Sequence, residues 1–171
     1  DGRADLAVAS RGTGTGVVHK QGGNWFSEPP AFGGGFSPNA IATGDLDQDG
    51  DVDVATATGD FFQADRVDVL MNDGTGRLSQ GPSLAAGGRT PDEIAVADLN
   101  GDGRRDLAWL AGAATRALVT SLANADGTFA DPVSKTQPTF SGAQLALGDV
   151  DGDGDVDALT TKTDAFAVLV S

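Results

Sequence analysis

The chain has 171 residues, of which 39% are hydrophobic, 25 are glycine and none is cysteine. This length and hydrophobic content suffice for a folded domain with its own core, and the absence of cysteine excludes a disulfide framework and a thiolate metal site. The formal net charge of −14 disfavours nucleic acid and anionic lipid as partners, and no apolar run reaches the roughly 18 residues that a membrane-spanning helix requires.

Short apolar segments recur along the chain, are bounded by Gly and Asp, and show no helical period. They predict an all-β fold. In chain order, the predicted strands are 6–9, 17–18, 41–44, 54–57, 67–71, 94–97, 107–110, 118–122, 145–148, 158–161 and 166–170. Turns at 72–75 and 124–129 are each expected to lead into a further, weaker strand.

Three Asp-rich loops align without gaps, at 45–53, 98–106 and 149–157, and a shortened copy occupies residues 1–5. Their equivalent residues Asp1, Asp49, Asp102 and Asp153 are 48, 53 and 51 residues apart. This period predicts one domain, residues 1–171, that is built of internal repeats. The predicted repeats are approximately 1–48, 49–101 and 102–152, with a partial repeat at 153–171.

Each predicted repeat has four short strands, and the strand before each loop ends in small residues at alternate positions. These small residues are Ala42 and Gly44, Ala95 and Ala97, and Ala146 and Gly148. Small side chains suit a crowded inner strand, so the repeats predict β-propeller blades of four antiparallel strands. About three and a half repeats are visible, which predicts part of a larger propeller of about six to eight blades. The further blades would come from a longer chain or from an oligomer.

The loop pattern Asp-x-Asp/Asn-x-Asp-Gly-x-x-Asp, the hydrophobic strand after each loop and the Asp-Gly-Thr-Phe turn at 126–129 resemble one known family. It is the FG-GAP and VCBS repeat family, whose repeats also build the propeller of integrin α-subunits. Phe32 and Gly33, followed by Pro38, are similar to the signature that names the family, whereas the later repeats lack the Phe. The resemblance covers nearly the whole chain. It implies loops that bind calcium and a propeller that binds proteins or carbohydrates outside the cytoplasm.

The residue types in the loops favour calcium. Acids at positions 1, 3 and 5, Gly at position 6, a backbone carbonyl at position 7 and an acid at position 9 match its preference for about six to eight oxygen ligands. Without a cation, two carboxylates about 5 Å apart would repel by roughly 3 kcal/mol at an effective dielectric of 20. The expected ligands of about three Ca2+ ions are Asp45, Asp47, Asp49, the carbonyl of Asp51, and Asp53; Asp98, Asn100, Asp102, the carbonyl of Arg104, and Asp106; and Asp149, Asp151, Asp153, the carbonyl of Asp155, and Asp157.

Other metal sites fit less well. An EF-hand needs a Glu at its twelfth position and flanking helices, and a transition-metal site would need His or Cys, which no loop contains. Magnesium is disfavoured because it keeps several of its waters. The second loop differs from the other two by Asn100 and two neighbouring Arg residues, so its occupancy is open from sequence alone.

No nucleophile–base motif occurs and the clustered acids are expected to be metal ligands, so we expect no catalysis. The expected function is that of a calcium-binding propeller that serves adhesion or binds a protein or carbohydrate. Its expected location is extracellular, either secreted or at the cell surface, or else periplasmic. The alternatives are a lectin-type propeller that binds glycans and a non-catalytic propeller part of a secreted polysaccharide-degrading enzyme. Phe61 and Phe62 are the candidate ligand contacts, with folding back to cover a blade as the alternative. Trp109 is expected to pack between blades rather than to stack on a sugar.

Overall fold

The computed structural model describes residues 5–10, 15–22, 25–27, 38–59, 64–87, 90–112, 116–136, 144–162 and 165–169. These residues form β-strands joined by turns and loops, and they contain no helix. The prediction of an all-β fold is therefore confirmed. Within the same ranges, the structure offers no helical segment that could cross a membrane.

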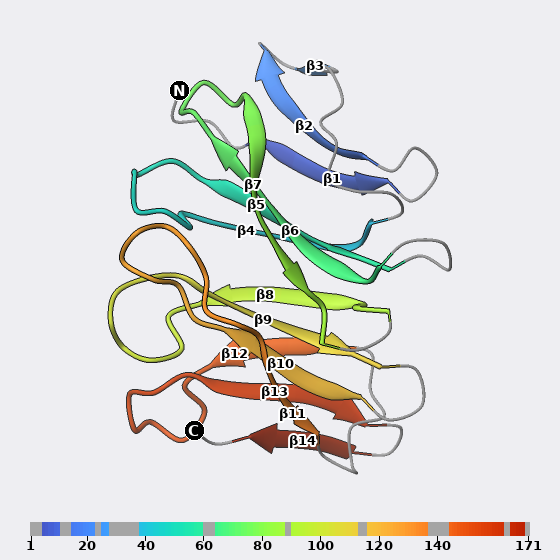
Figure 1. Ribbon diagram of the computed structural model, residues 1–171, viewed down its shortest axis with the longest axis vertical. Coiled ribbons are helices and arrows are strands. Elements are labelled where there is room, and N and C mark those ends of the chain that lie inside the picture. Colours follow the sequence, from blue (N-terminus) through green and yellow to red (C-terminus); the bar gives the residue numbers. More distant parts are fainter. Residues whose placement is uncertain are drawn as a thin grey trace.

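The strands form four antiparallel sheets that follow one another along the chain (Figure 1). The first sheet contains β1 (Leu6–Ser10), β2 (Thr15–Gly22) and β3 (Trp25–Ser27). The second contains β4 (Pro38–Gly44), β5 (Asp53–Thr58), β6 (Arg66–Asn72) and β7 (Leu78–Ala85). The third contains β8 (Glu93–Ala97), β9 (Asp106–Ala111), β10 (Ala117–Ser121) and β11 (Val133–Thr136), and the fourth contains β12 (Leu145–Gly148), β13 (Asp157–Lys162) and β14 (Ala165–Leu169).

The second and third sheets have the four strands that the repeat predicts, and in each sheet consecutive strands pair with one another. The turns predicted at 72–75 and 124–129 precede the fourth strands β7 and β11. Strand β7 is eight residues long, so it is more extensive than the weak strand that the sequence indicated. Among the described residues, the first and fourth sheets have three strands each. The larger propeller and its number of blades stay predictions.

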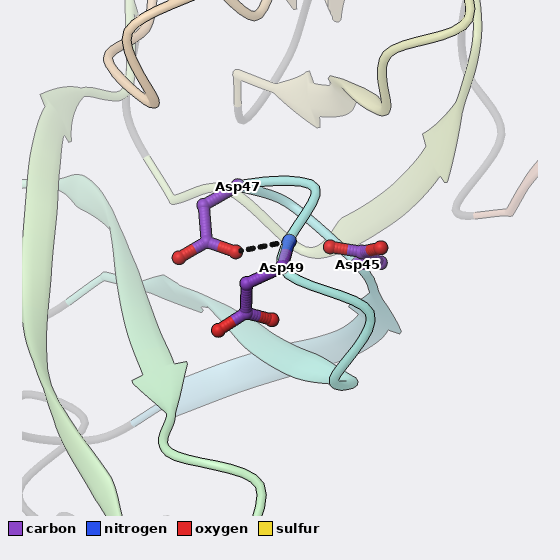
Figure 2. Close-up of side chains that lie close together, drawn as sticks. All are labelled: Asp45, Asp47 and Asp49. Carbon is purple, nitrogen blue, oxygen red and sulfur yellow. Dashed lines mark hydrogen bonds between the residues drawn. The ribbon is translucent and has the colours of Figure 1, made fainter.

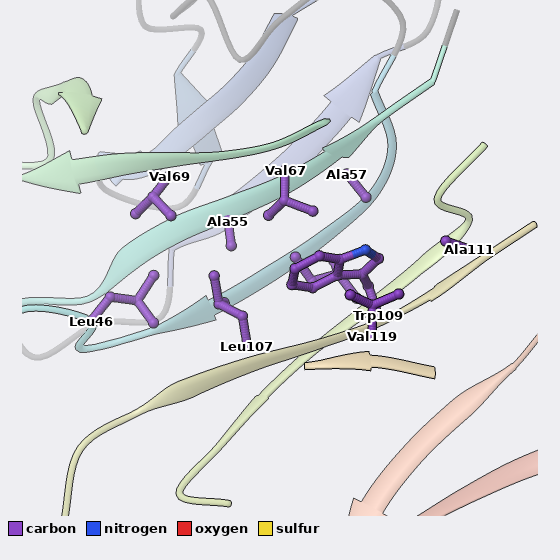
Figure 3. Packing of buried hydrophobic residues seen from close by; sticks show 10 residues of the cluster. Leu46, Ala55, Ala57, Val67, Val69, Leu107, Trp109, Ala111 and Val119 are labelled. Atoms are coloured by element: carbon purple, nitrogen blue, oxygen red, sulfur yellow. The ribbon is translucent and has the colours of Figure 1, made fainter. Parts of the chain in front are cut away.

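The main hydrophobic core lies between the second and third sheets (Figure 3). Side chains alternate between the two faces of a strand, and one face of β5 and β6 packs in this way against one face of β9 and β10. Trp109 lies at the centre of the contact, beside Val67 and Val119. The buried members of the cluster are Leu46, Ala55, Ala57, Val67, Val69, Ile94, Leu107, Trp109, Ala111 and Val119.

The opposite faces of the same strands pack against the outer sheets. Val54 and Leu70 of the second sheet lie against Ala7 of the first sheet. Leu110 of the third sheet lies in a cluster with Ala158 of the fourth sheet. All residues of β5 and of β9 are buried, because neighbouring sheets cover both of their faces.

Trp109 joins two neighbouring sheets. Its side chain is 0% exposed, and its indole Nε1 donates a hydrogen bond of 2.8 Å to the carbonyl of Ala86, which follows strand β7. A buried indole N–H needs such a partner, since leaving it without one would cost the free energy of its desolvation. The expected packing role of Trp109 is therefore confirmed.

The first strands of successive sheets run beside one another, with β8 between β4 and β12. A Cβ atom added to Gly44 on β4 would lie 2.7 Å from Cγ1 of Val96 on β8, so this position has no room for a larger residue. The expected crowding is confirmed there. At Gly148 on β12, however, an added Cβ would meet no described atom within 4 Å, so crowding does not explain that glycine.

Candidate metal centre

Each Asp-rich loop joins the first strand of a sheet to the next strand. The 45–53 loop connects β4 to β5, the 98–106 loop connects β8 to β9, and the 149–157 loop connects β12 to β13. Gln48 Nε2 donates a hydrogen bond of 3.3 Å to the carbonyl of Gly103. The first two loops are therefore in direct contact.

Side-chain oxygens within each loop hold its backbone in a tight turn. In the 45–53 loop, the backbone N–H of Asp49 donates to Asp47 Oδ1 at 3.1 Å, and that of Asp51 donates to Asp49 Oδ1 at 2.9 Å. The equivalent bonds of the 149–157 loop measure 3.1 and 2.9 Å. The residue at position 6 has a φ of 94° in the first loop and 97° in the third, a region that favours the glycine found there.

This turn brings the acids of positions 1, 3 and 5 together. Within the described residues, two groups of three carboxylates have oxygen atoms within 4.8 Å of one another, and they are Asp45, Asp47 and Asp49 (Figure 2), and Asp149, Asp151 and Asp153. Among the described residues, none donates a hydrogen bond to the buried Oδ1 of Asp45. A bound cation would satisfy this oxygen and offset the carboxylate charges, so both groups fit the oxygen ligands that calcium prefers.

The acid at position 9 of each loop is buried and holds the backbone. Asp53 is 0% exposed, and its two oxygens accept hydrogen bonds of 2.8 Å from the backbone N–H groups of Leu46 and Asn72. Asp106 accepts equivalent bonds of 2.9 and 2.7 Å from the N–H groups of Leu99 and Ala123. Each of these carboxylates therefore ties the start of its loop to the end of the third strand. Asp157 likewise accepts a bond of 3.0 Å from the N–H of Val150.

Two of the position-9 acids, Asp53 and Asp106, have a raised pKa. Burial raises the pKa of Asp53 above its usual value, the two backbone hydrogen bonds oppose this shift, and the charges of Asp47 and Asp49 add to it. Burial raises the pKa of Asp106 in the same way, with the other acids of its loop contributing. A cation in the loop would offset these unfavourable charges.

The remaining expected ligands are not grouped with the triads. The carboxylate group of the 45–53 loop does not include Asp51 or Asp53 among its described members, and the Asp51 side chain lies against Gly74 in the turn after β6. Coordination by the acids at position 9 and by the backbone carbonyls of Asp51, Arg104 and Asp155 stays a prediction.

The 98–106 loop has the same turn but a different set of side chains. Asn100 stands at position 3, and its Nδ2 donates a hydrogen bond of 2.8 Å to Asp102 Oδ2. The guanidinium group of Arg104 forms an ion pair with the same oxygen. Desolvation acts to raise the pKa of Asp98, but four backbone N–H groups donate to it and hold that pKa below its usual value. The sequence did not indicate that the Arg104 side chain would lie inside the loop.

A cavity of about 240 Å³ lies between the third and fourth sheets. Its apolar lining includes Leu118 and Leu147, and its polar lining comprises Asn100, Thr120 and Lys135. The two residues that the sequence indicated as candidate ligand contacts, Phe61 and Phe62, lie outside the described residues.

In a comparison with known protein families, residues 1–56 match a model described as the FG-GAP-like repeat. This match confirms the resemblance that the loop motifs indicated and supports a β-propeller-type repeat domain. A search of curated proteins returned no significant match to the chain.

Proposed function

We propose that this chain, in which residues 1–56 match the FG-GAP-like repeat, is a calcium-binding propeller domain that serves adhesion or ligand binding outside the cell. The proposed calcium sites are the loops 45–53 and 149–157, with the triads Asp45, Asp47 and Asp49, and Asp149, Asp151 and Asp153 as ligands. Calcium would hold each loop in its turn by cancelling the repulsion of its carboxylates.

The observation that carries this proposal is the convergence of three carboxylates at the same positions of two separate loops. One oxygen of the first triad, Asp45 Oδ1, is buried and accepts no hydrogen bond from any described residue. Buried polar atoms normally have a partner, so this oxygen supports a ligand in the loop. The loops offer oxygen atoms alone, which favours calcium over softer metals.

Calorimetric titration of the chain with calcium tests the proposal. We expect binding to the wild-type chain, with one ion lost in Asp49→Asn and another lost in Asp153→Asn, because each substitution removes a charge from one triad. The exposed Asp131, which lies outside the loops, provides the control Asp131→Asn, which should bind as the wild type does. Equal calcium binding by the wild type and both loop variants would contradict the proposal.

We also propose that the domain is non-catalytic and that its ligand is a protein or a glycan. The clustered acids are assigned to the ion, and the sequence offers no nucleophile–base pair for chemistry. Incubation of the pure chain with polysaccharide and ester substrates should give no turnover. Turnover that a substitution outside the loops abolishes would contradict this part of the proposal and favour an enzymatic role.

The cavity between the third and fourth sheets favours glycan binding as the second candidate function, because concave sites with a few polar groups suit small ligands. Binding of the chain to a glycan array, and its loss in Lys135→Ala, would support a lectin-type propeller. Retention of glycan binding in this variant would place the glycan elsewhere on the domain.

A further inference from the structure

We infer that the 98–106 loop holds no calcium ion, because the Arg104 guanidinium group supplies the positive charge that calcium would supply in the other two loops. This inference rests on the proposed calcium sites in the loops 45–53 and 149–157. It separates the three loops, which share one backbone turn, into two that respond to calcium and one that is held by the chain itself.

The 98–106 loop carries less negative charge than the other two loops, as the inference requires. Loops 45–53 and 149–157 each contain five Asp residues and no basic residue. The 98–106 loop contains three Asp residues, Asn100 at position 3, and the basic residues Arg104 and Arg105 at positions 7 and 8. The second loop therefore has far less negative charge for a divalent cation to offset.

The contacts of Asp102 show where the positive charge lies. Its Oδ2 forms the ion pair with the Arg104 guanidinium group and also accepts a hydrogen bond of 2.8 Å from Asn100 Nδ2. Its Oδ1 accepts the backbone N–H of Arg104 at 2.9 Å. Both carboxylate oxygens of Asp102 therefore already have donors. In the other loops, the side chains at positions 3 and 7 are carboxylates, which offer no guanidinium or amide N–H to the acid at position 5.

The Arg104 side chain is also fixed from its other side. Its Nε donates a hydrogen bond of 2.9 Å to the carbonyl of Ala123, whose N–H donates to Asp106 at 2.7 Å. The side chain is 28% exposed, so it is partly withdrawn from water. Arg104 thus links the loop to the segment after β10. Calcium could enter only if it displaced this group from Asp102, because two cations beside one carboxylate repel each other.

Binding stoichiometry in a background without the two proposed sites gives the first test. In Asp49→Asn/Asp153→Asn, the chain should bind no calcium by calorimetry. Adding Asn100→Asp, Arg104→Asp and Arg105→Val makes loop 98–106 match the 149–157 loop at positions 3, 7 and 8, and this variant should regain one ion. If the background variant binds an ion that Asp102→Asn then removes, the inference is wrong and the proposed function is unaffected.

Thermal melting in a calcium chelator gives the second test, and circular dichroism at low temperature establishes that each variant is folded. Arg104→Gln should lower the melting temperature by about 2–4 °C, since it removes a charge-assisted contact on each side of the guanidinium group. The exposed neighbour provides the matched control Arg105→Gln, which should leave the melting temperature unchanged. Equal effects of the two substitutions would overturn the inference. A wild-type chain that binds no calcium would instead contradict the proposed function, and this melting comparison would then decide the inference by itself.

Discussion

Asp106 connects parts of the third sheet that are distant in sequence. Its carboxylate is fully buried and accepts the backbone N–H groups of Leu99 and Ala123. The replacement Asp106→Asn would place an amide NH2 group, which is a donor, against one of these N–H groups. We expect a loss of about 2–3 kcal/mol in the free energy of unfolding, since hydrogen bonds to a charged acceptor are strong and the N–H would stay buried without a partner.

Urea denaturation in a chelator measures this loss without any contribution from bound metal. Asp131→Asn, on an exposed part of the chain, is the matched control and should change the free energy of unfolding by less than about 0.5 kcal/mol. A similar stability of Asp106→Asn and Asp131→Asn would show that Asp106 does not hold the loop to the end of the third strand.

Glu93, on strand β8, should make stability depend on pH. Burial raises its pKa above the usual value, the nearby charge of Asp92 adds to this shift, and Arg116 opposes it. The protonated side chain is thus favoured in the folded state, so its ionisation reduces stability as the pH rises from the unfolded pKa through the folded one. We expect Glu93→Gln to be more stable than the wild type at pH 7, and the difference to vanish below about pH 4.

Urea denaturation of the two proteins at several pH values measures this difference. A constant difference across the range, or a Glu93→Gln variant that is less stable at pH 7, would contradict the assignment.

The sequence could predict which acids form the carboxylate triads, because their spacing of two residues around a Gly turn is enough to group them. It could not separate these acids from the one at position 9. All of them are Asp, and only the folded loop shows that Asp45 and Asp49 belong to one carboxylate triad while Asp53 is buried and ties Leu46 to Asn72. The position of the Arg104 side chain could not be predicted either, because its partner Ala123 is 19 residues away in the sequence.

At the scale of elements, the strands that line the core could be predicted from their apolar runs, because β5 and β9 are covered on both faces. A weak strand after the turn at 72–75 could also be predicted, but the full length of strand β7 could not. Its segment contains Gly81 and Pro82 and is mostly polar, which suits an edge strand and gives no alternating pattern. Its register with β6 is instead fixed by pairing across the turn that Asp73 and Thr75 close.

The close approach of β4 and β8 gives a prediction about the inner strands. Gly44→Ala would place a methyl group 2.7 Å from Val96 Cγ1, and the stiff valine side chain cannot turn away freely. We expect a loss of about 1–3 kcal/mol in the free energy of unfolding. The companion change Val96→Ala should reduce this loss, so a double-mutant cycle should give a coupling of at least about 0.5 kcal/mol.

The control for this prediction is Gly148→Ala on β12. An added Cβ there meets no described atom within 4 Å, so this variant should be as stable as the wild type to within about 0.5 kcal/mol. Equal losses at Gly44 and Gly148, with no coupling to Val96, would show that the two inner strands do not crowd each other.

At the scale of the whole molecule, each sheet packs on its neighbours in the chain, so the core is a series of contacts between successive sheets. The contact between the second and third sheets is the most extensive, and Trp109 lies within it. Loops 45–53 and 98–106 touch through Gln48 and Gly103, beside this same contact. Calcium bound in the first loop, as proposed, would therefore lie next to the largest contact between sheets.

This arrangement predicts how amide hydrogen exchange varies along the chain. Amides of β5, β6, β9 and β10 should exchange most slowly, because these strands line the central core and have partners on both sides. If they exchange only through global unfolding, each bound calcium ion should slow them about a hundredfold at a hundredfold excess over its Kd.

Exchange followed by mass spectrometry, in calcium and in chelator, tests this prediction and the difference between the loops together. Amides within 45–53 and 149–157 should gain additional local protection when calcium binds, because the triads then hold the turn that their own repulsion loosens. Amides within 98–106 should change no more than the core strands do, because Arg104 holds that loop with or without calcium. Equal local protection by calcium in all three loops would contradict the separate role of the middle loop. Faster exchange in β9 than in the edge strand β7 would contradict the central place of the third sheet in the core.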